Sequence, residues 1–205
     1  MPLRAILLAA FAFAIHGQPL IQGPIVVLVG APGAGKTTQA AALSKIYGLP
    51  VISSEDLIKN NPGVFQKIRE LKLTGMEPQT DPVLNKLFLE RVKQGDAAAG
   101  VIVAGYPATK DHADFLAKMV ADKSLPVPTI LQLDVPDDDV RKRLASSPEY
   151  TPAKLDQLLK DYHREFDMLK LYFPNAEVTT IDGRPKVEQV TKNIQALLDK
   201  KIKKK

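Results

Sequence analysis

A run of glycines that ends in a lysine and a threonine is the part of this sequence best suited to chemistry. Residues 30–37 read GAPGAGKT and match the pattern G-x-x-x-x-G-K-[ST]. Glycines in such a loop let successive backbone N–H groups point inward, toward phosphate oxygens. Lys36 supplies a positive charge for the outer phosphates, and the hydroxyl of Thr37 is a ligand for Mg²⁺. The pattern therefore predicts a loop that holds the phosphates of a nucleotide.

The residues on either side of this loop have the order that a phosphate site requires. Residues 25–30 are an apolar run that predicts a buried strand, and residues 35–47 have a helical pattern. The N-terminus of that helix would add the positive end of its dipole to the site. A glycine-rich turn that binds no ligand is the alternative, and the strand–loop–helix order argues against it.

Apolar runs alternate with helical patterns along most of the chain, which predicts an α/β fold. The expected strands are residues 25–30, 49–53, 101–105, 129–135 and 177–182. The expected helices are residues 35–47, 81–94, 110–120, 136–146, 152–171 and 186–198. Strands joined through helices pair in parallel by right-handed crossovers. We therefore predict three layers, with a five-stranded parallel sheet and helices on both faces.

The composition excludes several classes of site. The 205 residues are 45% hydrophobic, which suits one domain with a substantial core. The chain has no cysteine, so disulfides, thiolate zinc sites and cysteine nucleophiles are excluded. Its histidines are His16, His112 and His163, and they have no metal-ligand spacing.

The two ends of the chain differ from its middle. Removing the five lysines of residues 200–205 from the 28 basic residues leaves 23, equal to the 23 acidic residues. The middle is therefore near neutral, which does not indicate a nucleic-acid partner. We interpret the tail as a solvated end, and contact with an anionic membrane or an acidic partner is the alternative. Residues 1–22 contain an apolar run too short to span a membrane, which suits a targeting segment or a short packed helix.

Several segments resemble adenylate kinases. GAPGAGKTTQAA is similar to the family's opening G-x-P-G-x-G-K-G/T-T-Q, YGLPVISSEDLIK to YGLxHISTGDLLR, and LDVPDDDVRKRL to LDVPDExxxxR. The stretch KQGDAAAGVIVAGYPATKDHADFL is similar to the family's stretch that ends in DGFPRTxxQAxxL. The resemblance covers about residues 24–198 and implies a P-loop NTPase fold over residues 23–199. Residues 54–80 would form the insert that binds a nucleoside monophosphate (NMP), and residues 146–151 a short lid.

The resemblance also implies a reaction, in which Mg-ATP donates its γ-phosphoryl group to a monophosphate such as AMP. Lys36 and Arg143 would be the catalytic charges, and Thr37 would bind Mg²⁺. The implied ATP-binding residues are Gly30, Ala31, Pro32, Gly33, Ala34, Gly35, Lys36, Thr37, Thr38 and Arg143. The implied NMP-binding residues are Ser54, Asp56, Lys59, Gly105, Tyr106 and His112. ATP chemistry favours the cytoplasm or an organellar matrix, and a targeting segment would decide between compartments.

The acceptor side departs from the family pattern. Lys59 replaces an arginine, and therefore keeps the charge but loses the two-pronged guanidinium. Ala104 replaces the aspartate that organises Mg²⁺, Ala108 and Ser147 replace arginines, and His112 replaces the glutamine that reads adenine. These losses predict that the family reaction is weakened or lost. Two hypotheses remain open: a working NMP kinase, and a non-catalytic structural or regulatory subunit of a larger assembly that keeps the nucleotide site.

Overall fold

The structure, a computed structural model, describes residues 19–64, 66, 81–176 and 178–202. Its strands are β1 (Ile25–Gly30), β2 (Val51–Ser53), β3 (Val101–Ala104), β4 (Thr129–Asp134) and β5 (Val178–Asp182). They form one sheet in the order β2-β3-β1-β4-β5, and every neighbouring pair is parallel. The predicted fold class, a five-stranded parallel α/β sheet, is confirmed.

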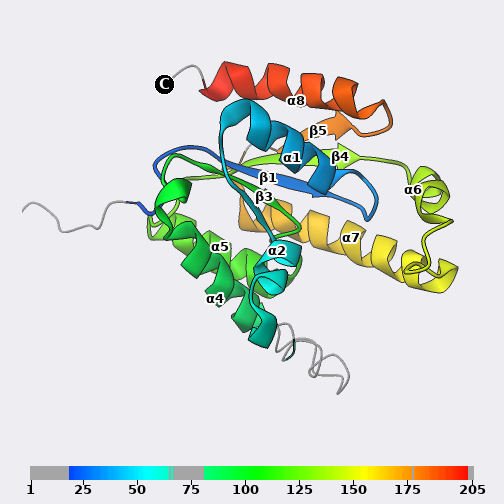
Figure 1. The fold of residues 1–205 in the computed structure, drawn as a ribbon, viewed down its shortest axis with the longest axis horizontal. Helices are drawn as coiled ribbons and strands as arrows, with labels where there is room; N and C mark the ends of the chain where they lie inside the picture. Colours follow the sequence, from blue (N-terminus) through cyan, green and yellow to red (C-terminus); the bar gives the residue numbers. More distant parts are fainter. Residues whose placement is uncertain (1–18, 65, 67–80, 177, 203–205) are drawn as a thin grey trace, which may run out of the picture.

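Helices cover both faces of this sheet. They are α1 (Lys36–Tyr47), α2 (Ser54–Lys59), α4 (Asp81–Val92), α5 (Lys110–Ala121), α6 (Asp137–Leu144), α7 (Pro152–Tyr172) and α8 (Val187–Ile202), with a short 3₁₀ helix, η2 (Gly95–Ala97), after α4. Figure 1 shows α1 and α8 on one face of the sheet, and α4, α5 and α7 on the other. The three predicted layers are therefore present.

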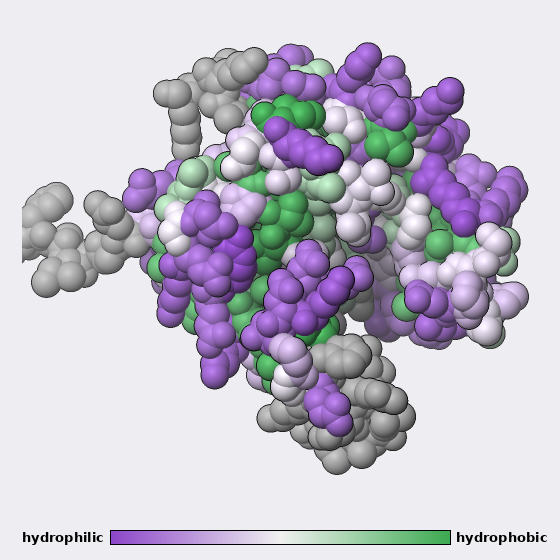
Figure 2. All heavy atoms as spheres, viewed as in Figure 1, coloured by the Kyte–Doolittle hydropathy of each residue, from purple (hydrophilic) through white to green (hydrophobic). Residues whose placement is uncertain are grey.

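The central strand β1 separates two hydrophobic cores. All six of its residues are buried, as expected for a strand covered on both faces. Val26 and Leu28 pack into the core beneath α1 and α8, whereas Val27 and Val29 pack into the core beneath α4, α5 and α7. On the face seen in Figure 2, hydrophilic residues form most of the outline and hydrophobic residues show near its centre.

Local signals set several helix ends. Ser53, Thr109 and Thr151 cap α2, α5 and α7, since each side chain accepts a hydrogen bond from a backbone N–H of the first turn. Gly48 ends α1 with a left-handed φ of 67°.

The strand register places all five carboxyl ends at one edge of the sheet. Gly30 lies opposite Leu133, Ser53 opposite Ala104, and Asp134 opposite Asp182. The connections that follow the strands therefore meet at this edge, which is where open α/β sheets bind ligands.

Parts of four expected segments lie outside the described residues. These parts are residues 1–18 of the N-terminal segment, residues 65 and 67–80 of the insert, residue 177 of the last expected strand, and residues 203–205 of the tail. In the described ranges, no helix combines the length and the apolar character that crossing a membrane requires.

Candidate nucleotide-binding site

The glycine loop lies between β1 and α1 and has the backbone geometry of an anion cradle. Gly33 and Gly35 have φ angles of 72° and 98°, in the region that favours glycine. Gly35 is the N-cap residue of α1 and supplies no side-chain hydrogen bond to the helix. The first N–H groups of α1 therefore lack a side-chain cap and suit an anionic ligand.

Lys36 turns its ammonium group back onto this loop. Nζ donates hydrogen bonds to the carbonyl oxygens of Gly30 at 2.7 Å and Ala31 at 2.9 Å. Burial lowers the pKa of Lys36 to about 8, so the group is mostly charged at pH 7. Within the described ranges no carboxylate forms an ion pair with it. No carboxylate in the described part of the chain therefore neutralises its positive charge.

Arg143 reaches the same loop from α6. Its Nη1 donates to the carbonyl oxygen of Gly33 at 3.2 Å, and its Nη2 to that of Gly183 at 2.8 Å. Its neighbours Arg141 and Lys142 instead pair with carboxylates of α6 and α7. Of these three adjacent cations, Arg143 is thus the one that bridges the glycine loop and the loop after β5.

The residues at the loop fit a magnesium ion that is held largely by nucleotide phosphates. Thr37 is exposed at the start of α1, where its hydroxyl is accessible. Ala104 ends β3 and is 3% exposed within an apolar cluster, so β3 offers no carboxylate. No cluster of three or more histidine, cysteine, aspartate or glutamate side chains among the described residues could hold a metal. Mg²⁺ commonly keeps several waters and uses few protein ligands, which agrees with this sparse donor set.

On the acceptor side, the structure joins α2 to the loop after β3. Ser54 Oγ donates a hydrogen bond to the carbonyl oxygen of Gly105. Asp56 is exposed and accepts a hydrogen bond from Ser53 Oγ at 2.7 Å, and Lys59 is exposed at the end of α2. Ser54 and Gly105 are therefore brought together, whereas no hydrogen bond or ion pair joins Asp56 or Lys59 to the glycine loop among the described residues.

Tyr106 and His112 belong to the packed interior. They are 1% and 2% exposed, and their ring centroids are 4.8 Å apart. His112 Nδ1 accepts a hydrogen bond from the Ala108 N–H at 3.3 Å, so the ring proton is on Nε2. Nε2 lies 3.3 Å from Asp81 Oδ1 without hydrogen-bond geometry. Burial lowers the pKa of His112, and the charge of Asp81 opposes this shift in part.

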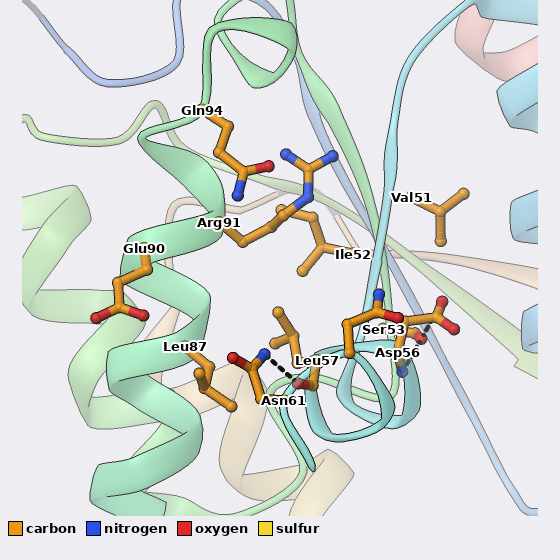
Figure 3. Close-up of a pocket in the computed structure, with 11 residues that line it drawn as sticks. Val51, Ile52, Ser53, Asp56, Leu57, Asn61, Leu87, Glu90, Arg91 and Gln94 are labelled. Carbon is orange, nitrogen blue, oxygen red and sulfur yellow. Dashed lines mark hydrogen bonds between the residues drawn. The ribbon is translucent and has the colours of Figure 1, made fainter. Parts of the chain in front are cut away.

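A cavity of about 440 Å³ lies beside β2, at the edge of the sheet and away from the glycine loop. Figure 3 shows Arg91 of α4, and Gln94 just before η2, reaching toward β2, with Leu57 and Leu87 below them. Asp56 is the only expected site residue among those that line this cavity.

The expected short lid is a tight turn between α6 and α7. Ser147 N–H donates to the Leu144 carbonyl at 3.0 Å, and Tyr150 N–H donates to the Ser147 carbonyl at 3.2 Å. Ser147 thus lies in the turn and offers no guanidinium to a nucleotide.

Two features of the site were missed by sequence reasoning. The loop after β5, residues 183–186, contacts the glycine loop through Arg143. Gln39 is 3% exposed and bonds to the first turn of α8. The sequence signal for the loop at residues 183–186 was a turn pattern, DGRPK, after a strand. The signal for Gln39 was a polar residue on a helix face that is otherwise apolar.

Known proteins are similar in sequence to most of this chain. A family model described as adenylate kinase matches residues 28–200, from β1 to α8. An adenylate kinase of Brucella anthropi is 31% identical over 188 residues, which cover 84% of this chain and 97% of the relative. An adenylate kinase of Mesorhizobium japonicum is 28% identical over 188 residues, covering 84% and 95%. The family carries out nucleotide-binding phosphoryl transfer with ATP and Mg²⁺, and this chain belongs to the adenylate kinase family.

Proposed function

We propose that this protein binds Mg-ATP in the glycine loop and transfers its γ-phosphoryl group to a nucleoside monophosphate at a reduced rate. One observation carries the proposal: two cations, Lys36 and Arg143, converge on the loop and hydrogen-bond only to carbonyl oxygens among the described residues. Carbonyl oxygens do not neutralise a positive charge. An anionic ligand in the loop would neutralise the two positive charges. Phosphate groups suit this role, because their oxygens accept hydrogen bonds from the backbone N–H groups of the loop.

On the donor side, each residue has a physical task. The free backbone N–H groups of the glycine loop and of the N-terminus of α1 hold the phosphate oxygens in place. The Lys36 ammonium exchanges its two carbonyl partners for the outer phosphates, and the Thr37 hydroxyl contacts Mg²⁺. The metal, when bound, neutralises charge between the phosphates. Arg143 lies where it can stabilise the charge of the nucleotide from the side of α6.

On the acceptor side, fewer charges are available. Phosphoryl transfer depends on positioning and on neutralising the transferring group. Lys59 contributes one exposed ammonium group, while Ala104 and Ala108 contribute no polar group. Each arginine or donor lost from such a site lowers the rate by orders of magnitude, and the losses do not simply add. We therefore expect turnover well below the roughly 1–100 s⁻¹ that is typical of kinases.

The second candidate is a non-catalytic subunit that retains the nucleotide site. Ala104 favours it, because that position lies at the end of β3 in an apolar cluster and has no carboxylate for Mg²⁺. Such a subunit would bind Mg-ATP as the first candidate does. Only the chemical step separates the two.

Calorimetric titration with ATP, GTP and the four common monophosphates, followed by a coupled assay for ADP formation from ATP and AMP, tests the proposal. We expect saturable Mg-ATP binding and slow ADP formation. In Ala104→Asp with Ala108→Arg, the rate should rise at least about tenfold, because a metal-organising carboxylate and a guanidinium return. Absence of Mg-ATP binding would overturn the proposal. ADP formation at ordinary kinase rates would refute the reduced rate, and no turnover even in the double variant would leave the non-catalytic subunit.

A further inference from the structure

Gln39 connects the helix that follows the glycine loop to the start of the last helix. It lies on α1, three residues after Lys36, and is 3% exposed. Its Nε2 donates to the carbonyl oxygen of Val187 at 3.1 Å, and its Oε1 accepts from Thr191 Oγ1 at 2.7 Å. Thr191 Oγ1 also lies 2.9 Å from the Val187 carbonyl oxygen. Both ends of this buried amide are thus bound to the first turn of α8.

The start of α8 holds one end of the loop after β5, and the sheet holds the other end, where the Gly183 N–H donates to the Asp134 carbonyl oxygen at 2.7 Å. Val187 begins α8 and directly follows residues 183–186. Gly183 packs so closely that a Cβ atom there would lie 2.7 Å from Val135 Cγ2 and 3.6 Å from the Ala34 carbonyl oxygen. Its own carbonyl oxygen accepts the hydrogen bond from Arg143. A shift of the α8 start would therefore strain the loop that carries both carbonyl partners of Arg143 Nη2, those of Gly183 and Arg184.

The contacts of Gln39 connect it to residues beside the glycine loop and not to the backbone of the loop itself. The glycine loop is shaped by its own backbone and by Lys36, whereas Arg143 and the exposed residues 184–187 form the surface beside it. A nucleotide whose phosphates occupy the loop has to place its sugar and base outside the loop. Gln39 consequently acts on two groups: Arg143, whose charge also faces the phosphates, and the loop after β5, which a bare polyphosphate does not need.

We propose that Gln39 is a positioning residue for Arg143 and the loop after β5, and through them for the nucleoside part of the bound nucleotide. The inference rests on the proposed function, in which the glycine loop holds the phosphates of ATP. The inference goes beyond the proposed function in one respect. It separates the contribution of the nucleoside to the binding affinity from that of the phosphates, and it makes the nucleoside contribution depend on the buried amide of Gln39.

A purely structural role, as a link between α1 and α8, is the competing explanation, and the chain offers a matched control for it. Tyr47, the last residue of α1, donates a hydrogen bond to Asp199 Oδ1 of α8 at 2.9 Å. This bond joins the same two helices at the end far from the glycine loop. Tyr47→Phe therefore weakens the helix pair without disturbing the start of α8.

The test compares Mg-ATP with inorganic tripolyphosphate in the presence of Mg²⁺, by calorimetry on the full chain. Gln39→Met keeps the length of the side chain and removes both hydrogen bonds. We expect it to weaken Mg-ATP binding about tenfold and tripolyphosphate binding only about threefold, because the polyphosphate loses part of the Arg143 contribution and nothing from the loop after β5. Thr191→Val should shift the same ratio in the same direction, and it carries the test if Gln39→Met does not fold. Tyr47→Phe should leave the ratio unchanged.

Three results would overturn the inference. Gln39→Met and Thr191→Val could weaken both ligands equally, they could weaken neither, or Tyr47→Phe could change the ratio as much as they do. Failure of the unmodified protein to bind either ligand is a different result, because it refutes the proposed function itself and removes the basis of the inference.

Discussion

Arg143 donates a hydrogen bond to the carbonyl oxygen of Gly33, which precedes it by 110 residues in the chain. The contact brings the end of α6 onto the glycine loop, and Leu144, the next residue, lies beside Gly33 as well. Together with Lys36, Arg143 gives the loop two positive charges that no described carboxylate neutralises. This arrangement leads to four predictions beyond the test of Gln39.

Replacing Lys36 by methionine should remove most of the affinity for Mg-ATP. The substitution keeps the aliphatic stem and deletes the ammonium group, whose charge-assisted bonds to phosphate account for about a hundredfold in affinity. Calorimetric titration measures the loss, and circular dichroism checks that the fold persists. Mg-ATP binding within about threefold of the unmodified protein would show that the ammonium does not contact the phosphates.

The pH dependence of binding should report the same group. Burial lowers the pKa of Lys36 to about 8, so the free protein loses this charge as pH rises through that value. Mg-ATP affinity should fall above pH 8 in the unmodified protein and stay flatter in Lys36→Met. For stability the sign is reversed: between about pH 8 and 10.5 the unfolded chain binds more protons, so the contribution of Lys36 to the free energy of unfolding rises with pH. If the affinity for Mg-ATP changed equally with pH in both proteins, Lys36 would not be the group that titrates.

His112 should make the protein less stable in mild acid. Its pKa is lowered by burial, with Asp81 opposing the shift in part, so the folded state binds a proton less readily than the unfolded chain does. The free energy of unfolding should therefore fall as pH drops below about 6.5, the ordinary value for histidine. His112→Gln removes this contribution. Urea unfolding at pH 7 and pH 5 should show a smaller loss in the variant, and the prediction fails if both proteins lose the same amount.

Gly33→Ala should cost both stability and nucleotide affinity. Its φ of 72° strains any other residue, and a Cβ atom would lie 3.1 Å from Leu144 Cγ. We expect a loss of about 1–2 kcal/mol from backbone strain, with a further loss from crowding against Leu144. Gly48→Ala is the control, because its φ is 67° and no atom lies within 4 Å of its Cβ position.

Unfolding in urea and Mg-ATP titration measure the two effects. The control should lose only the strain contribution and keep its affinity for Mg-ATP. An equal loss of stability in both variants would show that Leu144 moves aside without cost.

Most of the fold could be predicted because its signals are local. Continuous apolar runs identified the buried strands, helical spacing identified the helices, and the βα alternation implied the parallel sheet. The largest difference at a strand end has a local cause: β2 begins at Val51 rather than residue 49, since Pro50 has no N–H to donate to a ladder. The strand β3 ends at Ala104 because Gly105 adopts a φ of 72°.

The sequence by itself determined the glycine loop, since the residues that shape it are adjacent and its geometry depends on their own φ and ψ angles. Only the tertiary structure decided what surrounds that loop. Arg143 meets Gly33, Gln39 meets Val187 from 148 residues away, and His112 lies against Asp81 in the interior. Such contacts depend on how whole helices pack on the sheet. The spacing and the types of the residues along the chain do not predict this packing, because the two residues of each pair come into contact only when the two cores form.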